Sequence, residues 1–258
     1  MLNLLQIEWI KLKSNKTFWI LIILFIGIQG LVFYGLDSFK LSFNGEADGP
    51  GATFDALNVF KHPNIWQYFG YMAGFFKIVL AVLLIQLLNN EFEYRTYRQH
   101  IIDGLSREQN FMLKVLIMKG LAIFSVLFLI LMVFVFGTNP DEVSFLDKFD
   151  FAIGLFIENL GFLAFAFVLT HFIKKTGLVL GILLLWALAV EPIIHYKYPD
   201  IGDYLPLQVF SDLIEMPFIS LINNQLQENV PVSQLLLAIG YIYIFSGIAY
   251  LKVKRSDL

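Results

Sequence analysis

Long apolar runs separated by short polar stretches divide the 258-residue chain. A helix needs about 20 mostly apolar residues to cross a bilayer core of about 30 Å. Six runs approach that length and predict an all-α membrane protein with six transmembrane helices. The runs cover residues 17–36, 68–88, 115–136, 151–173, 177–194 and 234–251.

The fifth run is the weakest of the six. Only residues 177–190 are uninterrupted before Glu191 and Pro192. At a rise of about 1.5 Å per residue, this stretch is too short to cross the core. Two interpretations stay open: Glu191 lies within the membrane boundary, or neighbouring helices shield a short segment bent at Pro192.

Composition and charge agree with a multi-pass membrane protein. The chain is 58% hydrophobic and only 15% charged, whereas soluble domains carry about 25% charged residues. With six spans, 13 of the 18 Lys and Arg residues fall on the side of the two termini, and 13 of the 21 acids fall in the opposite loops. Because Lys and Arg accumulate in cytoplasmic loops, both termini are predicted to be cytoplasmic.

The most charged stretch, "NNEFEYRTYRQHIIDGLSREQ" at residues 89–109, follows the second run. We expect a short helix over 91–104, ended by Gly104 in the left-handed conformation that glycine tolerates. Ser106 and Gln109 then form the pattern of a capping box and open the next helix.

The predicted helix over 91–104 has one contact stripe, because Tyr94, Tyr97 and Ile101 recur at helical spacing. One interpretation is a docking helix whose aromatic stripe enters a groove on a cytoplasmic protein, with Arg95 and Arg98 setting the register. The other is a solvated connection between two spans. The residues alone do not separate these two interpretations.

The first 16 residues are predicted to form an amphipathic helix at the cytoplasmic interface, before a transmembrane domain over 17–258. A helix with one apolar stripe and a Trp can lie in the interface with its cations toward anionic headgroups. The alternative is a plain extension of the first span. The stripe consists of Leu2, Leu5, Trp9 and Leu12, with Glu8, Lys11 and Lys13 off it.

The outer segment over 203–228 is too apolar for a free loop. Pro206 and Pro217 divide it, and leave Leu207–Met216 and Phe218–Asn223 as short amphipathic pieces. Apolar stretches of about 10–14 residues are typical of interfacial or re-entrant segments rather than of spans. The residues themselves favour an interfacial cap.

Five polar residues lie at membrane depth: Gln29, Lys77, Glu158, Asn159 and Glu191. A charge near the bilayer centre costs about 2.5–3.5 kcal/mol on insertion scales, so such groups face the interior and pair. One hypothesis is that they line a translocation path or bind a polar substrate group. The other is a structural pair, Lys77–Glu158 or Lys77–Glu191.

The chain lacks the common motifs of catalysis. It has no G-x-x-x-x-G-K-[ST] phosphate loop, no H-E-x-x-H, no G-x-S-x-G and no cysteine. The four histidines show no metal-ligand spacing. We therefore expect no catalytic residue, no metal and no cofactor in this chain.

The combination of these features resembles an ABC-2 type transporter permease. Members begin with a basic, aromatic amphipathic segment, here "LLQIEWIKLKSNKTFWILI", and have six spans. An "E-x-x-x-x-T-x-R" to "G-L-S-R" block follows the second span and is matched here by Glu91, Thr96 and Arg98, then Gly104 and Arg107. Arg95 stands where members often have Gly.

The resemblance implies that 91–104 is a coupling helix seated on a separate ATPase subunit, and that the outer segment forms re-entrant helices. It implies two ATPase copies that bind ATP and Mg²⁺, and a second permease copy or a similar permease. The location would be the bacterial cytoplasmic membrane, with lipids but no nucleic acid as further partners. The apolar composition favours export of an amphipathic substrate such as a peptide, drug or lipid. Alternatives are a non-transporting scaffold or sensor, and an ion-coupled secondary transporter using Lys77 and Glu158.

Overall fold

The computed structural model of the chain describes residues 2–43, 59–94, 104–139, 142–217 and 226–255. These residues form helices and no strand, apart from one isolated bridge between Lys61 and Thr138. The prediction of an all-α fold is confirmed. The longer helices are α1 (Leu2–Ser14), α2 (Lys16–Phe43), α3 (Ile65–Gly74), α4 (Lys77–Glu93), α6 (Arg107–Phe136), α7 (Asp150–Ile173), α8 (Thr176–Leu185) and α13 (Val232–Arg255).

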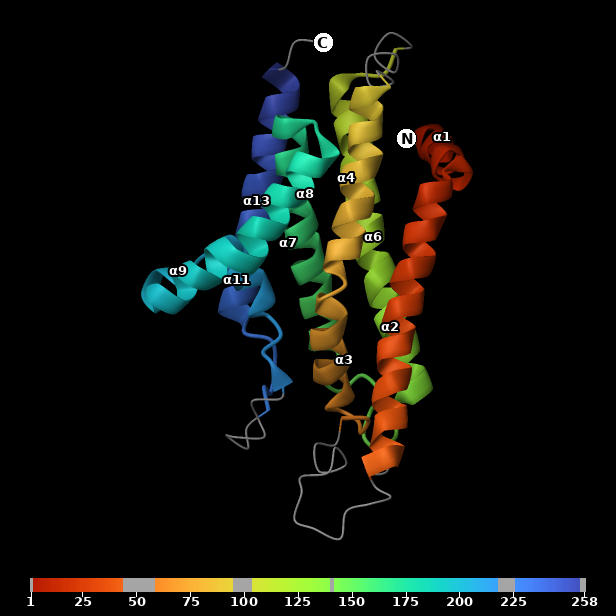
Figure 1. Cartoon of the computed structure of the whole chain (residues 1–258), viewed down its shortest axis with the longest axis vertical. Helices are drawn as coiled ribbons and strands as arrows, with labels where there is room; N and C mark the ends of the chain where they lie inside the picture. The colour runs from red at the N-terminus through yellow and green to blue at the C-terminus, as the bar shows by residue number, and fades with distance from the viewer. Residues whose placement is uncertain (1, 44–58, 95–103, 140–141, 218–225, 256–258) are drawn as a thin grey trace.

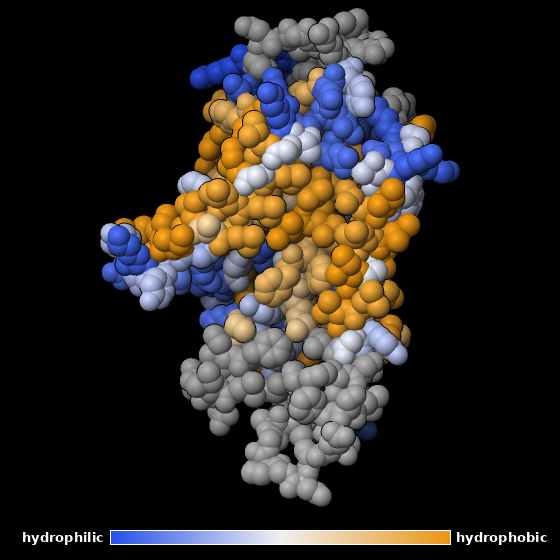
Figure 2. Space-filling view, in the orientation of Figure 1, coloured by the Kyte–Doolittle hydropathy of each residue, from blue (hydrophilic) through white to orange (hydrophobic). Residues whose placement is uncertain are grey.

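The helices form one elongated bundle in which α1 and the end of α13 lie at the same end (Figure 1). Within the described ranges, five helical segments are long and apolar enough to cross a membrane, and a sixth arises if the bent pair α3–α4 counts as one span. The chain is therefore a multi-pass helical membrane protein. Figure 2 shows an apolar band across the middle of the visible face and polar side chains gathered at the end that carries both termini, called the terminal end below.

Helix α7 is the centre of the bundle. Within its most apolar window 72% of the residues are buried, against 17% for α13. It packs against α3, α4, α6, α8 and α13. Because every neighbour removes part of its surface from lipid, α7 is apolar on all sides, as expected for a buried helix.

The second span is not the single helix over 68–88 that the sequence predicts. It begins at Ile65 and is interrupted at Phe75 and Phe76, where α3 and α4 meet at an angle of 41°. No proline lies at this break, and the apolar pattern of the sequence continues through it. The break makes Lys77 the first residue of α4.

The fifth span continues past the predicted end at residue 194. After α8 come a π-helical turn, η2 (Trp186–Val190), and α9 (Glu191–Lys197). Pro192 lacks the N–H that an α-helix needs, and a wider π turn is one way for a helix to pass such a residue. Figure 1 shows α9 projecting sideways from the bundle. Glu191 is only 1% exposed, whereas Ile193 and Tyr196 of α9 are 63% and 91% exposed, so the packing covers Glu191 and not the rest of this segment.

The outer segment is part of the packed core rather than a free loop. It contains α10 (Pro199–Gly202) and α11 (Pro206–Ser211), so the observed helix is shorter than the predicted piece Leu207–Met216. Phe210 is fully buried against α7, where a Cβ at Gly161 would lie 2.3 Å from its ring. The predicted piece Phe218–Asn223 lies outside the described residues.

Candidate functional site

Two groups of polar side chains stand out in this apolar bundle. One lies at the terminal end, where α1, α4 and α6 meet, and the other lies deep in the bundle, beside both helix irregularities. The first is called the charge cluster and consists of Glu8, Lys11, Glu91 and Lys114.

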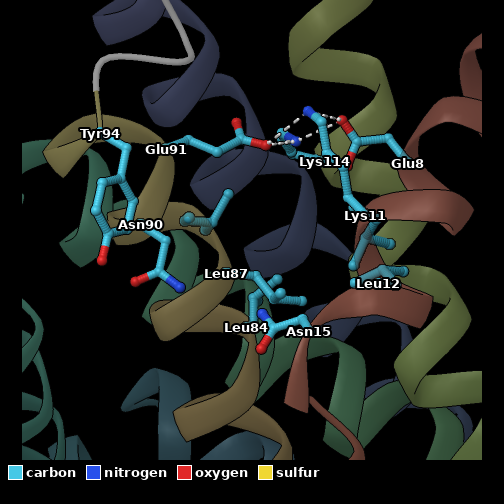
Figure 3. A pocket seen from close by; sticks show the side chains of 12 residues that line it. Glu8, Lys11, Leu12, Asn15, Leu84, Leu87, Asn90, Glu91, Tyr94 and Lys114 are labelled. Carbon is cyan, nitrogen blue, oxygen red and sulfur yellow. Dashed lines mark hydrogen bonds and ion pairs between the residues drawn. The ribbon is translucent and has the colours of Figure 1, made fainter. Parts of the chain in front are cut away.

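Lys114 is the centre of the charge cluster. Its ammonium lies 3.0 Å from Glu8 and also donates to the carboxylate of Glu91. Lys11 lies 3.3 Å from Glu8 and 3.7 Å from Glu91. The side chains converge from three helices, as Figure 3 shows. The cluster therefore ties α1 and α6 to the last turn of α4.

Electrostatics keep Glu8 ionised. Burial by itself raises the pKa of Glu8, but the charges of Lys114 and Lys11 and their hydrogen bonds outweigh it, and the net pKa lies below the ordinary 4.5. Two cations and two carboxylates balance in this cluster, so removing one member leaves one excess charge among partly buried groups, which is costly.

A cavity of about 250 Å³ adjoins the cluster and is walled by Leu12, Leu84 and Leu87 on its apolar side (Figure 3). Asn15 separates α1 from α2, and its side-chain oxygen accepts hydrogen bonds from the backbone N–H groups of Thr17 and Phe18. Asn15 therefore caps the start of the first span.

The cluster was not found from the sequence. Glu8 was expected to lie off the contact stripe of α1, yet it is only 5% exposed, whereas Trp9 is 55% exposed. Lys114 is one of the 13 basic residues that the sequence predicts on the side of the two termini. The sequence does hold a signal, because Lys114 lies three residues after Phe111 and four before Met118, a spacing that puts all three on one helical face. The structure buries that face of α6.

Two of the predicted coupling residues are described before the gap at 95–103. Glu91 belongs to it, and Tyr94 follows the end of α4 with 73% of its surface exposed. Arg95, Thr96, Tyr97, Arg98 and Ile101 lie outside the described residues, so the helix over 91–104 stays a prediction.

Beyond that gap the chain follows the predicted pattern. Gly104 has a φ of +98°, and Ser106 caps α6 in a full capping box with Gln109. Arg107 donates to the carbonyl of Lys254 at the end of α13, at 3.2 Å. Tyr250 of α13 also donates to Glu108, at 2.6 Å. The start of α6 is therefore joined to α13.

The second group contains the predicted intramembrane charges. Lys77 lies 2.6 Å from Glu158 and 3.2 Å from the hydroxyl of Ser211. Of the two pairs considered, the structure contains Lys77–Glu158. Glu191 instead accepts hydrogen bonds from the indole N–H of Trp186, at 2.6 Å, and from the backbone N–H of Gln208, at 2.8 Å.

Both helix irregularities lead to this group. Lys77 begins α4 immediately after the break in the second span, and Glu191 follows the π turn of the fifth. Lys77 and Glu191 line the same cavity of about 200 Å³. Irregular backbone at such a position is frequent at functional sites, and intramembrane ionisable residues mark functional sites by default.

Gln29 and Asn159 do not join this cavity. Asn159 donates to Ser125 of α6 at 2.9 Å. Gln29 is fully buried on α2, and its amide atoms have no hydrogen-bond partner among the described residues. The five polar residues predicted at membrane depth therefore do not share one site. Lys77 and Glu191 line one cavity and Glu158 pairs with Lys77, whereas the amides of Gln29 and Asn159 lie elsewhere in the bundle.

No protein-family model matches this chain, and no curated protein matches it. The structure by itself shows a multi-pass helical membrane protein with the charge cluster at its terminal end and an ion pair within the bundle.

Proposed function

We propose that the chain is the permease subunit of an ATP-driven transporter of the ABC-2 type, coupled to a separate ATPase. One observation carries the proposal: the segment over 95–103 is bracketed by two anchors. On one side Glu91 is held by Lys114 and Lys11, and on the other the capped start of α6 is joined to α13 through Arg107.

This arrangement suits the transmission of force. A partner that displaced the segment over 95–103 would move α4 and α6 together, because both continue directly from it. Through the charge cluster the displacement would reach α1, and through Arg107 it would reach α13. A solvated connection would need none of these bonds. Two ATPase copies and a second permease would complete the transporter, with ATP and Mg²⁺ bound only by the ATPase.

The proposed direction is export of an amphipathic substrate across the bacterial cytoplasmic membrane, with both termini on the cytoplasmic side. The charge distribution supports that orientation, because the terminal end carries most of the Lys and Arg residues. In this orientation α1 is an interfacial helix, and α10 and α11 belong to a re-entrant outer segment.

The test separates docking from coupling. The tagged chain is purified gently from native membranes, and the proteins that accompany it are identified. We expect a near-stoichiometric ATPase that is lost when Tyr97 and Arg98 are both changed to Ala. Lys114→Met, which breaks the charge cluster, should keep the ATPase bound but reduce the substrate-stimulated ATP hydrolysis.

The matched control is Lys119→Met, on the exposed side of the same helix. It should change neither ATPase binding nor ATP hydrolysis. If no ATPase accompanies the chain even after crosslinking, the proposal is wrong.

An ion-coupled secondary transporter is the second candidate, and the buried Lys77–Glu158 pair is the observation that favours it. Transport that stops when the proton gradient is collapsed but continues without ATP would select this candidate. A scaffold or sensor would bind a cytoplasmic partner and transport nothing.

A further inference from the structure

The cavity beside Lys77 and Glu191 has the features of a binding site. It has a volume of about 200 Å³ and lies between α4, α7, the η2–α9 segment and α11. If a water-sized group takes about 30 Å³, the cavity holds roughly six or seven such groups. That is enough for a polar head and the first few methylenes of a chain.

The charges around this cavity do not balance. The charge of Lys77 is matched by Glu158, at 2.6 Å. Glu191 is 1% exposed, and the donors that the structure places on it are all neutral: the indole of Trp186 and the backbone N–H groups of Leu207 and Gln208. Among the described residues no Lys, Arg or His forms an ion pair with Glu191. Buried carboxyl groups are either paired with a cation or neutralised by protonation, so an incoming cation would supply the counter-charge that an ionised Glu191 lacks in this cavity.

The rim of the cavity is apolar. Phe75 and Leu188 line it and are 60% and 67% exposed. Both belong to helical segments that are long and apolar enough to cross a membrane, so the rim faces hydrocarbon or another membrane protein rather than water. A ligand entering here must have an apolar part.

Other polar groups in the cavity fit an ammonium head. Ser211 and Gln208 also line it. The hydroxyl of Ser211 accepts one hydrogen bond from Lys77, and the amide N–H of Gln208 donates to Asp212. The second lone pair of Ser211 and the amide oxygen of Gln208 can therefore still accept. An ammonium has three donors and no acceptor, so Glu191 and these oxygens can satisfy it completely. An anionic head would meet the unpaired carboxylate of Glu191 and a lysine that already has a partner.

We propose that this cavity binds the ammonium head of a lipophilic amine, with Glu191 as its counter-charge and the tail leaving between Phe75 and Leu188 into the bilayer. That this amine is the transported substrate rests on the proposed function. Its binding does not, and binding is tested alone.

The experiment uses the full chain purified in dodecyl maltoside, a neutral detergent, at pH 7.5. The probes are n-octylamine, octan-1-ol and octanoate, which share a chain length and differ in the charge of the head. Trp186 reports binding, because its indole donates to Glu191. The relevant signal is the saturable change in tryptophan fluorescence that disappears in Trp186→Phe.

We expect octylamine to bind at least tenfold more tightly than octanol, and octanoate to bind more weakly than both. Glu191→Gln should remove the preference for the amine, because the glutamine keeps the size of the side chain but not the charge. The matched control is Glu142→Gln, an exposed acid outside the cavity, which should keep the preference unchanged.

Three results would overturn the proposal: equal affinity for amine and alcohol, tighter binding of octanoate, or a preference for amine that survives Glu191→Gln. If Glu191→Gln elutes as an aggregate, Leu188→Phe decides, because it narrows the rim at an exposed position without changing charge and without adding a second indole to the fluorescence signal. Octylamine affinity that stays the same in Leu188→Phe places the binding elsewhere and also overturns the proposal.

This binding experiment contains no ATPase, so its failure and the failure of the proposed function are distinct. Amine binding without an accompanying ATPase would support the binding site and refute the proposed transporter. An accompanying ATPase without amine binding would support the transporter and refute the binding site.

Discussion

Replacing Lys77 by methionine removes the ammonium that lies 2.6 Å from Glu158 and leaves a carboxylate that is 4% exposed inside the bundle. Breaking a buried pair by removing one partner costs about 3–5 kcal/mol. For a chain of this size, each kcal/mol lowers the thermal midpoint by about 2–4 °C. We therefore expect Lys77→Met to lower the midpoint by roughly 6–20 °C, by combining these two ranges.

The double variant Lys77→Met/Glu158→Gln separates the loss of the ion-pair attraction from the cost of leaving a buried carboxylate unpaired. Most of the cost of the single change is the uncompensated carboxylate, so neutralising Glu158 should restore at least half of the lost midpoint. The assay is thermal unfolding of the purified chain, followed by loss of the monodisperse peak in size-exclusion chromatography. Lys119→Met, at an exposed position of α6, is the control and should leave the midpoint within about 2 °C, because surface changes stay within about 0.5 kcal/mol.

The reasoning is refuted if Lys77→Met lowers the midpoint no more than Lys119→Met does, or if the double variant is less stable than the single one. Transport per folded molecule then decides between the two hypotheses for the pair. If the folded yield falls while transport per folded molecule is intact, the pair is structural. A loss of transport in a well-folded variant would place the pair on the substrate path.

Three further predictions concern the fold. Gly161→Ala should destabilise the bundle by about 1–3 kcal/mol, because the new methyl meets the ring of Phe210 at 2.3 Å. The control Gly181→Ala has open space around it and should be neutral or stabilising. Equal effects of the two changes on the thermal midpoint would contradict the contact between Gly161 and Phe210. Because the pKa of Glu8 is lowered in the folded chain, its stabilising contribution is present above about pH 4.5 and is lost as the pH falls through the lower folded value. The difference in thermal midpoint between wild type and Glu8→Gln should therefore be constant from pH 8 to pH 5 and shrink below pH 5. A difference that grows on acidification would contradict this prediction. Ser106→Ala should cost about 1 kcal/mol and be detected as faster amide hydrogen exchange in the first turn of α6, whereas unchanged exchange would show that the cap is not needed.

Two of the functional proposals depend on neighbouring features of one bundle. The charge cluster joins α1, α4 and α6 at the terminal end, and α4 continues from there to Lys77 at the cavity. A displacement at the segment over 95–103 would therefore act on the helix whose other end lines the cavity. Lys114→Met leaves this continuous helix intact and removes only the ion pairs by which α6 is tied to α1 and α4.

The local elements were largely predictable from the sequence. Apolar runs of sufficient length can only be satisfied as helices in lipid, because an unpaired backbone group costs several kcal/mol there. The capping box at Ser106 and the left-handed glycine at Gly104 are also local, since each depends on residues within one turn. The break at Phe75 has no local signal in the sequence. The π turn before Glu191 lies next to Pro192, where one interpretation of the sequence places a bend.

Which polar groups meet was decided only by the tertiary structure. The sequence left Lys77 with two possible partners, and the bundle brings Glu158 to it while Trp186 and Gln208 satisfy Glu191. Glu8 and Lys114 are 106 residues apart, and no periodicity links them. Hydropathy determines which segments enter the membrane, because each segment meets lipid by itself. Pairing of charges depends on how those segments rotate and pack against one another, and a buried ion is stable only where that packing supplies its partner.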